Sequence, residues 1–229
     1  MVARANVCAT GVEWRRLNLP NEDDLLGRGL YYGAGASEAP LCGGEDVYVV
    51  GGGNSAGQAV MHLAKHARSV TMLVRDKTLA VSMSQYLSER ILGAANVQVQ
   101  YDAEITGLEG EKTLERIRIG SRTTKEANWA ATPLLFVAIG GVPNTDWAAD
   151  TAIVRDQGGY LVSGPDLLIN GNAAASWPLE RAPYYLETAV PGSFAAGDVR
   201  HRSIKRVATA AGEGAMAIAF VHRYLEETA

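Results

Sequence analysis

Short apolar runs alternate along this chain with segments whose apolar residues recur at helical spacing, a pattern typical of α/β proteins. Continuous apolar, β-branched runs at Asp46–Val50 and Leu134–Ile139 predict strands buried on both faces of a parallel sheet. A helix is expected from residue 54 to about residue 67, and a strand at Ser69–Val74 then completes a βαβ unit. The predicted packing face of that helix consists of Ala56, Ala59, Val60, Leu63 and Ala64.

Other segments carry weaker signals of the same kind. Alternation over Ala103–Glu109 and Thr113–Ile119, with a polar turn between them, predicts a hairpin. The capping-box pattern Ser82-x-x-Gln85 predicts the start of a helix that runs through Leu92. Further strands are expected at Arg4–Ala9, Val97–Tyr101 and Ser193–Ala196, and a long helix from Lys205 to about Glu226.

The motif with the clearest chemistry is Gly51-x-Gly53-x-x-Ala56, which lies between the first predicted strand and its helix. Gly51 permits the tight turn, Gly53 lets a pyrophosphate approach the backbone, and Ala56 allows close packing of helix and strand. The helix N-terminus offers free N–H groups and the positive end of the helix dipole to phosphates. The predicted dinucleotide-binding residues of this turn are Gly51, Gly52, Gly53, Asn54, Ser55 and Ala56.

Spacing alone is a weak signal, because Gly212-x-Gly214-x-x-Ala217 matches the same pattern. That second match lies in an alanine-rich helical segment without a strand before it, so no site is predicted there. At the first match, Asn54 or Ser55 is expected to cap the helix.

The end of the second strand distinguishes between the two nicotinamide dinucleotides. An acidic residue about 20 positions past the glycines would bind the ribose 2′-OH of NAD. This chain instead has Arg75 and Lys77, whose charges suit the 2′-phosphate of NADP. Asp76 lies between them, and charges of a solvated loop are the alternative interpretation.

The composition excludes several classes of function. The chain has 229 residues, is 47% hydrophobic and 20% charged, and has a net charge of −4, which gives no argument for nucleic acid or an anionic membrane as partner. No apolar run approaches the roughly 20 residues of a membrane-spanning helix, and the N-terminus does not resemble a signal peptide. Cys8 and Cys42 are expected to be reduced thiols in a cytoplasmic protein.

No metal site is predicted. His62 and His66 are spaced i, i+4, but Leu63 stands where a zinc-protease motif requires Glu. A half-exposed helix face is the ordinary explanation of this pair.

Taken together, these motifs resemble the low-molecular-weight (class II) thioredoxin reductases of the pyridine nucleotide-disulfide oxidoreductase superfamily. The matches occur in family order from about residue 3 to residue 228. They are Ala9-Thr10-Gly11, Gly27-Arg28-Gly29, VVGGGNSA at 49–56, FVAIGGVPNT at 136–145, FAAGDV at 194–199 and RVATAAGEGAMA at 206–217.

The resemblance implies a Rossmann-like three-layer NADP-binding domain at residues 28–146, inserted into a partial FAD-binding domain at residues 1–27 and 147–229. Leu17–Gly29 is expected to be a polar connector, and Tyr31–Gly44 a crossing between the domains. Besides the glycine turn, the residues implied at NADPH are Arg75, Lys77, Ile139 and Gly140. The residues implied on the flavin side are Thr10, Gly11, Gly197, Asp198, Arg206, Val207 and Ala208.

The chain departs from the family pattern at three points. The redox CxxC of the family would fall on Gly33 and Ala36, so electron relay through a dithiol is not expected by the usual route. A leading βαβ unit with its own GxGxxG for the FAD pyrophosphate is not found, so the chain resembles the C-terminal two thirds of a longer protein. Ala80 and Val81 replace basic residues that the family often has, which predicts a weaker grip on the 2′-phosphate.

The functional hypothesis is an NADPH-dependent flavoprotein oxidoreductase that transfers hydride from NADPH to FAD and electrons to an unknown acceptor. A homodimer is a candidate assembly. The alternative is an NADP(H)-binding module without turnover, or a fragment that needs its N-terminal half to hold FAD. The flavin colour of the purified protein distinguishes between them.

Overall fold

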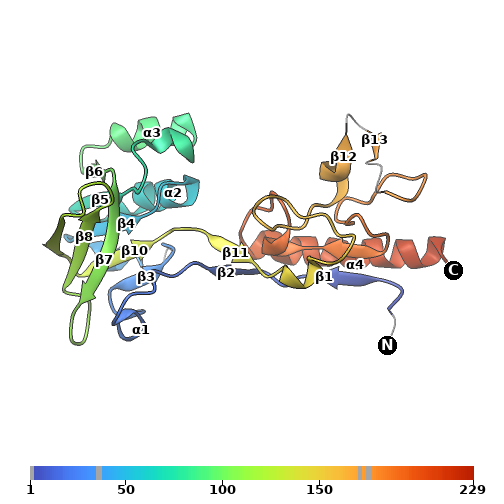
Figure 1. Cartoon of the computed structure of the whole chain (residues 1–229), viewed down its shortest axis with the longest axis horizontal. Helices are drawn as coiled ribbons and strands as arrows, with labels where there is room; N and C mark the ends of the chain where they lie inside the picture. The colour runs from blue at the N-terminus through green and yellow to red at the C-terminus, as the bar shows by residue number, and fades with distance from the viewer. Residues whose placement is uncertain (1–2, 35–37, 170–171, 174–176) are drawn as a thin grey trace. The chain divides into compact units, whose positions relative to one another are not determined.

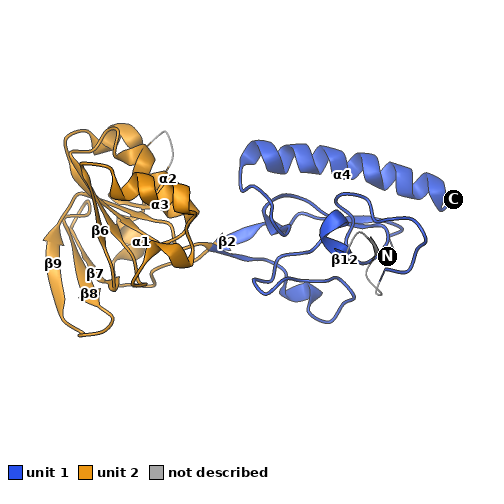
Figure 2. Cartoon of the chain, turned by 90° about the horizontal axis from the view of Figure 1, so that it is seen from above, with its two compact units in different colours: residues 1–13, 141–229 blue, residues 14–140 orange. Residues whose placement is uncertain are grey.

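A computed structural model describes residues 3–34, 38–169, 172–173 and 177–229. The chain divides into two compact units, of which unit 2 is Trp14–Gly140 and unit 1 is Met1–Glu13 with Gly141–Ala229 (Figure 2). Strands β2 (Val12–Trp14) and β11 (Gly141–Pro143) pair where the chain crosses between the units.

Unit 2 is built on a five-stranded parallel sheet with the order β3-β10-β4-β5-β6. Its strands are β3 (Leu30–Tyr32), β10 (Leu134–Val137), β4 (Asp46–Val50), β5 (Ser69–Leu73) and β6 (Val97–Gln100) (Figure 1). All four residues of β10 are buried, because this strand lies between β3 and β4 and is covered on both faces. The predicted α/β class with a buried parallel sheet is therefore confirmed.

Two different layers cover this sheet. On one face, α2 (Asn54–Leu63) and α3 (Gln85–Leu92) pack against Val47 and Val49 of β4. The next side chains along that strand, Tyr48 and Val50, point to the opposite face, as alternation along a strand requires. That face is covered by an antiparallel meander of β7 (Ala103–Glu109), β8 (Arg116–Ser121) and β9 (Ala127–Ala131). The three-layer arrangement matches the prediction.

The sequence signal missed three elements of unit 2. The predicted hairpin is part of a three-stranded meander. The sequence does not predict its third strand, β9, because that strand is half exposed and carries little apolar alternation. The predicted crossing at Tyr31–Gly44 begins with β3, in which Leu30 is fully buried at the sheet edge. The predicted connector Leu17–Gly29 contains the short helix α1 (Glu22–Leu25).

The predicted helix caps are also wrong. Helix α2 begins after Gly53, no side chain caps it, and it ends at Leu63 rather than near residue 67. The Asn54 Oδ1 atom instead accepts from the Ser84 N–H at 2.9 Å, and the Ser82 hydroxyl donates to the Gly52 carbonyl at 3.0 Å. The residue before α3 is Ser84 rather than Ser82, and its side chain does not cap the helix. These polar side chains therefore tie the glycine turn to the segment before α3 instead of capping their own helices.

Unit 1 has less regular structure. Strand β1 (Asn6–Cys8) pairs in parallel with β14 (Ser193–Ala195), and β12 (Leu168–Ile169) pairs with β13 (Asn172–Ala173). Its long helix α4 (Val207–Glu227) contacts β1 and β14, and the Tyr184 and Phe220 rings stack at 5.3 Å beside buried Phe194.

The described 3₁₀ turns of the two units are η1 (Ala39–Cys42), η2 (Leu79–Val81), η3 (Asp146–Ala148), η4 (Gly164–Leu167) and η5 (Gly197–Val199). Within the described ranges no helix has the length and apolar character to cross a membrane.

The unit boundaries differ from the expected domain boundaries at residues 28 and 146. Unit 2 begins earlier, because Leu17, Leu19 and Leu25 pack into the core beneath the meander. It also ends earlier, at Gly140, because Asn144 already bonds within unit 1: its side-chain amide donates to the Thr10 carbonyl at 3.0 Å.

We predict that Gly51→Ala destabilises unit 2 strongly. Gly51 has φ +142°, and an added Cβ would lie 2.3 Å from the Ala138 carbonyl oxygen. Backbone strain of this kind costs about 1–3 kcal/mol, and the steric clash adds to it. Urea denaturation followed by circular dichroism measures the loss. Gly53→Ala is the matched control, because a Cβ at Gly53 meets no atom closer than 3.7 Å; equal stability of the two variants would contradict the prediction.

Candidate dinucleotide-binding site

The turn from β4 into α2 lies at the carboxyl edge of the parallel sheet. The Gly51 N–H donates to the Leu73 carbonyl at 3.0 Å, and the Ala138 N–H donates to the Val50 carbonyl at 2.8 Å. The ends of β4, β5 and β10 are thereby held together. Ligands of open α/β sheets bind outside this edge, so the turn and the N-terminus of α2 are placed as a phosphate site requires.

The structure brings most of the predicted NADPH residues to this edge. Gly51, Gly52 and Gly53 form the turn, and Arg75 and Lys77 follow β5. After β10, Ile139 packs beneath the sheet, and the Gly140 carbonyl accepts from the Arg15 N–H at 3.0 Å. The exposed residues Asn54 and Ser55 and the buried Ala56 open helix α2.

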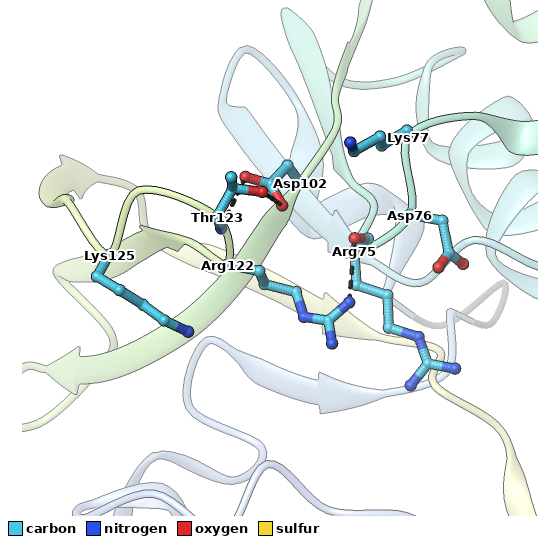
Figure 3. A pocket seen from close by; sticks show the side chains of 7 residues that line it. All are labelled: Arg75, Asp76, Lys77, Asp102, Arg122, Thr123 and Lys125. Atoms are coloured by element: carbon cyan, nitrogen blue, oxygen red, sulfur yellow. Dashed lines mark hydrogen bonds between the residues drawn. The ribbon is translucent and has the colours of Figure 1, made fainter.

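A basic pocket of about 390 Å³ lies beside the loop that follows β5 (Figure 3). Part of its wall comes from the turn between β8 and β9, which the sequence analysis did not connect with the nucleotide. Sequence reasoning missed these residues because it did not predict β9, and the turn is defined only by the pairing of β8 with β9. The lining residues are Arg75, Asp76, Lys77, Asp102, Arg122, Thr123 and Lys125.

Asp102 anchors this pocket. Its carboxylate accepts from the Ser121 hydroxyl at 2.7 Å, from the Thr123 hydroxyl at 2.9 Å and from the Thr123 N–H at 3.1 Å. The hydrogen bond from Ser121 is the largest contribution that lowers the pKa of Asp102. The carboxylate is therefore ionised at neutral pH and fixes the turn to the end of β6.

The predicted flavin-side residues of unit 1 lie at the carboxyl ends of β1 and β14. Thr10 and Gly11 follow β1, and Gly197 and Asp198 follow β14, its parallel neighbour. The Thr10 hydroxyl donates to the Asn144 carbonyl at 2.7 Å. Arg206, Val207 and Ala208 at the start of α4 are exposed, and Val207 retains 90% of its accessible surface.

A buried ion pair holds the turn at Gly197 against α4. One oxygen of Glu213 accepts from the Gly197 N–H at 2.8 Å, and the other accepts from the Arg200 guanidinium at 2.5 Å. Both charged side chains are about 7% exposed. The sequence analysis missed this pair; the signal was a single acid, Glu213, between Gly212 and Gly214 in an otherwise uncharged helical segment.

Neither cysteine has the features of a redox thiol. Cys8 and Cys42 are free and buried, and burial raises the pKa of both. Of the two positions where the family CxxC was expected to fall, Gly33 has φ +85° and donates to the Val137 carbonyl at 2.8 Å, whereas Ala36 lies outside the described residues.

His62 and His66 are neighbours in the structure. The rings of His62 and His66 are 5.8 Å apart, edge to face. In the part of the chain that the structure describes, no three His, Cys, Asp or Glu side chains gather as metal ligands would.

Comparison with known proteins agrees with this architecture. The family model "Pyridine nucleotide-disulphide oxidoreductase" matches residues 1–214, so the chain belongs to that family. A 34.2 kDa protein of the rubredoxin operon of Clostridium pasteurianum is 30% identical over 222 residues, covering 97% of this chain and 65% of that protein. An alkyl hydroperoxide reductase component from Pseudomonas putida is 34% identical over 218 residues, covering 94% of this chain and 37% of that protein.

Among solved structures, the crystal structure of thioredoxin reductase from Streptococcus pyogenes is similar to this chain with a TM-score of 0.73 and 26% identity. The match covers 98% of this chain and 66% of that one. The chain thus spans two thirds or less of the length of these relatives. The predicted resemblance to thioredoxin reductases is confirmed.

We predict that Glu213→Ala destabilises unit 1 by about 3–5 kcal/mol, because it leaves the Arg200 charge buried without its partner. Glu226→Ala, at an exposed position of the same helix, is the control and should change stability by less than about 0.5 kcal/mol. Thermal unfolding of both variants measures the difference. Similar melting curves would show that the pair does not hold the Gly197 turn.

Proposed function

We propose that the chain binds NADP(H) in unit 2 and contributes to an NADPH-dependent flavoprotein oxidoreductase of the thioredoxin-reductase type. The observation that carries the proposal is the joint position of the Gly51–Gly53 turn and the basic pocket at one sheet edge. A neutral or acidic lining beside β5 would have suited the ribose 2′-OH of NAD instead.

The residues of unit 2 fit an NADP(H) molecule. Gly51 lets the chain turn where no Cβ fits, and the uncapped N-terminus of α2 presents backbone donors to a pyrophosphate. Arg75 and Lys77 lie further along the same edge, where the adenosine ribose of a dinucleotide is expected. The polypeptide's role would be to orient the cofactor and balance its phosphate charges.

We assign part of a flavin site to unit 1. Thr10 and Gly11, the turn at Gly197 and Asp198, and the first residues of α4 fit the flavin and ribityl portions of FAD. Glu213 would act here as a positioning residue, because it fixes the Gly197 backbone. When bound, the nicotinamide would supply a hydride and the flavin would accept it. The electron acceptor would not be reached through Cys8 or Cys42, whose buried thiols have raised pKa values.

We predict that Gly53→Val weakens NADPH binding at least about tenfold, a loss of about 1.4 kcal/mol. The new side chain would stand where a pyrophosphate approaches the backbone, while the fold tolerates it, since a Cβ at Gly53 meets no atom closer than 3.7 Å. Isothermal titration calorimetry with the full chain measures the affinity. Gly212→Val is the matched control, because it alters the second glycine pattern, where a Cβ meets open space. NADPH affinity that is unchanged in Gly53→Val would place the site elsewhere.

We further predict that residues 1–229 retain FAD weakly. Among the described residues, Gly51–Ala56 is the one glycine turn that leads directly from a strand into a helix of eight or more residues, and we assign it to NADP(H). The pyrophosphate and adenine of FAD would therefore stay in water, without the backbone donors that neutralise two phosphate charges. Dialysis after loading with FAD, followed by absorbance measurement, gives the stoichiometry. About one FAD retained per chain would contradict the prediction, and a colourless protein that binds NADPH would favour a binding module without turnover.

A further inference from the structure

The turn between β8 and β9, residues 121–126, is fastened to the loop that follows β5. The Arg122 guanidinium donates to the Arg75 carbonyl at 3.4 Å, and the Arg122 N–H donates to the Asp102 carbonyl at 3.0 Å. The Asp102 N–H in turn donates to the Asp76 carbonyl at 3.3 Å. The side chain of Arg122, a cation from the meander, is thus held beside the cations that follow β5, although 47 positions in the sequence separate Arg122 from Arg75.

The conformation of the turn is determined by its own hydrogen bonds. The Lys125 N–H donates to the Ser121 carbonyl at 3.1 Å, and the Thr124 N–H donates to the Ser121 hydroxyl at 2.9 Å. Lys125 itself has φ +64°. Because the Asp102 carboxylate also binds this turn, Arg122 projects from a fixed backbone rather than from a loose loop. In Figure 3 the Arg122 side chain lies between those of Arg75 and Lys125.

The charges of the pocket favour an anion. Four cationic side chains, Arg75, Lys77, Arg122 and Lys125, accompany two carboxylates, Asp76 and Asp102. The Asp102 carboxylate already accepts three hydrogen bonds. The Arg122 guanidinium forms an ion pair with Glu104 at 3.6 Å, which is longer than a hydrogen bond, so further N–H donors of the guanidinium remain for a ligand. A phosphate monoester, with its charge near −2 and several acceptor oxygens, is the group that such a fork binds best.

We propose that Arg122, assisted by Lys125, is a specificity-determining residue that binds the 2′-phosphate of NADP(H) from the meander side. The inference rests on the proposed function, because the dinucleotide must lie along the sheet edge from the Gly51 turn to the loop after β5. Beyond Lys77, the loop that follows β5 carries no further cation before α3, and residues 80 and 81 are alanine and valine. Arg122 supplies from the opposite wall the charge that this loop lacks.

The test compares phosphorylated and unphosphorylated ligands on the full chain. We expect Arg122→Ala to weaken NADPH and adenosine 2′,5′-bisphosphate about tenfold, and to leave NADH and adenosine 5′-monophosphate within about twofold. Arg75→Ala should have the same selective effect. Arg118→Ala removes an exposed cation from β8, the strand before the turn, outside the pocket, and should change none of the four affinities. The dependence of NADPH affinity on salt should also be less steep in Arg122→Ala than in the parent.

Each outcome separates this inference from the proposed function. NADPH binding by the parent that weakens in Arg75→Ala but not in Arg122→Ala would overturn the role of Arg122 and leave the proposed function standing. Equal losses for NADPH and NADH in Arg122→Ala would also overturn it, since the residue would then only support the loop. A parent chain that binds neither nucleotide would overturn both. Circular dichroism melting curves that match the parent confirm that each variant is folded.

Discussion

The arrangement of unit 2 depends on one close approach, between the backbone of Gly51 and the carbonyl of Ala138. A Cβ at this glycine would lie 2.3 Å from that carbonyl oxygen and 2.9 Å from the Ala56 Cβ. Glycine alone lets β4 turn into α2 while β10 stays paired beside it. Because both helix packing and sheet pairing converge there, the N-terminus of α2 comes to lie at the carboxyl edge of the sheet, where a phosphate can be held.

The charge at that edge comes from two layers of the unit. The parallel sheet supplies Arg75 and Lys77, and the meander on its other face supplies Arg122 and Lys125. Asp102 joins the two layers, since it lies between β6 of the sheet and β7 of the meander and its carboxylate binds the turn after β8. A meander that otherwise only covers the sheet thereby also shapes the basic pocket.

Unit 1 uses a different means of fixing a short turn. Its two-stranded pairing of β1 and β14 is too small to define the turn at Gly197, and the buried Glu213 and Arg200 pair completes it. Such a pair contributes little net stability compared with apolar packing, but either partner alone is strongly unfavourable. The pair therefore specifies one geometry for the residues that we assign to the flavin.

The sequence by itself determined the βαβ unit, the packing face of α2 and the family, and it located β4 to the residue. These features depend on local periodicity and on glycines whose backbone role is local. It also indicated Arg75 and Lys77, which follow a strand directly. It did not predict β3, whose partner β10 is distant in sequence, or β9, which pairs with neighbouring β8 but is half exposed and has a weak pattern of its own. Only the tertiary structure decided that Asn54 and Ser82 brace the glycine turn, that Glu213 meets Gly197, and that Arg122 joins Arg75. The physical reason is common to all three: each is a contact of a polar side chain with a backbone group far along the chain, and no periodicity of apolar residues records such a contact.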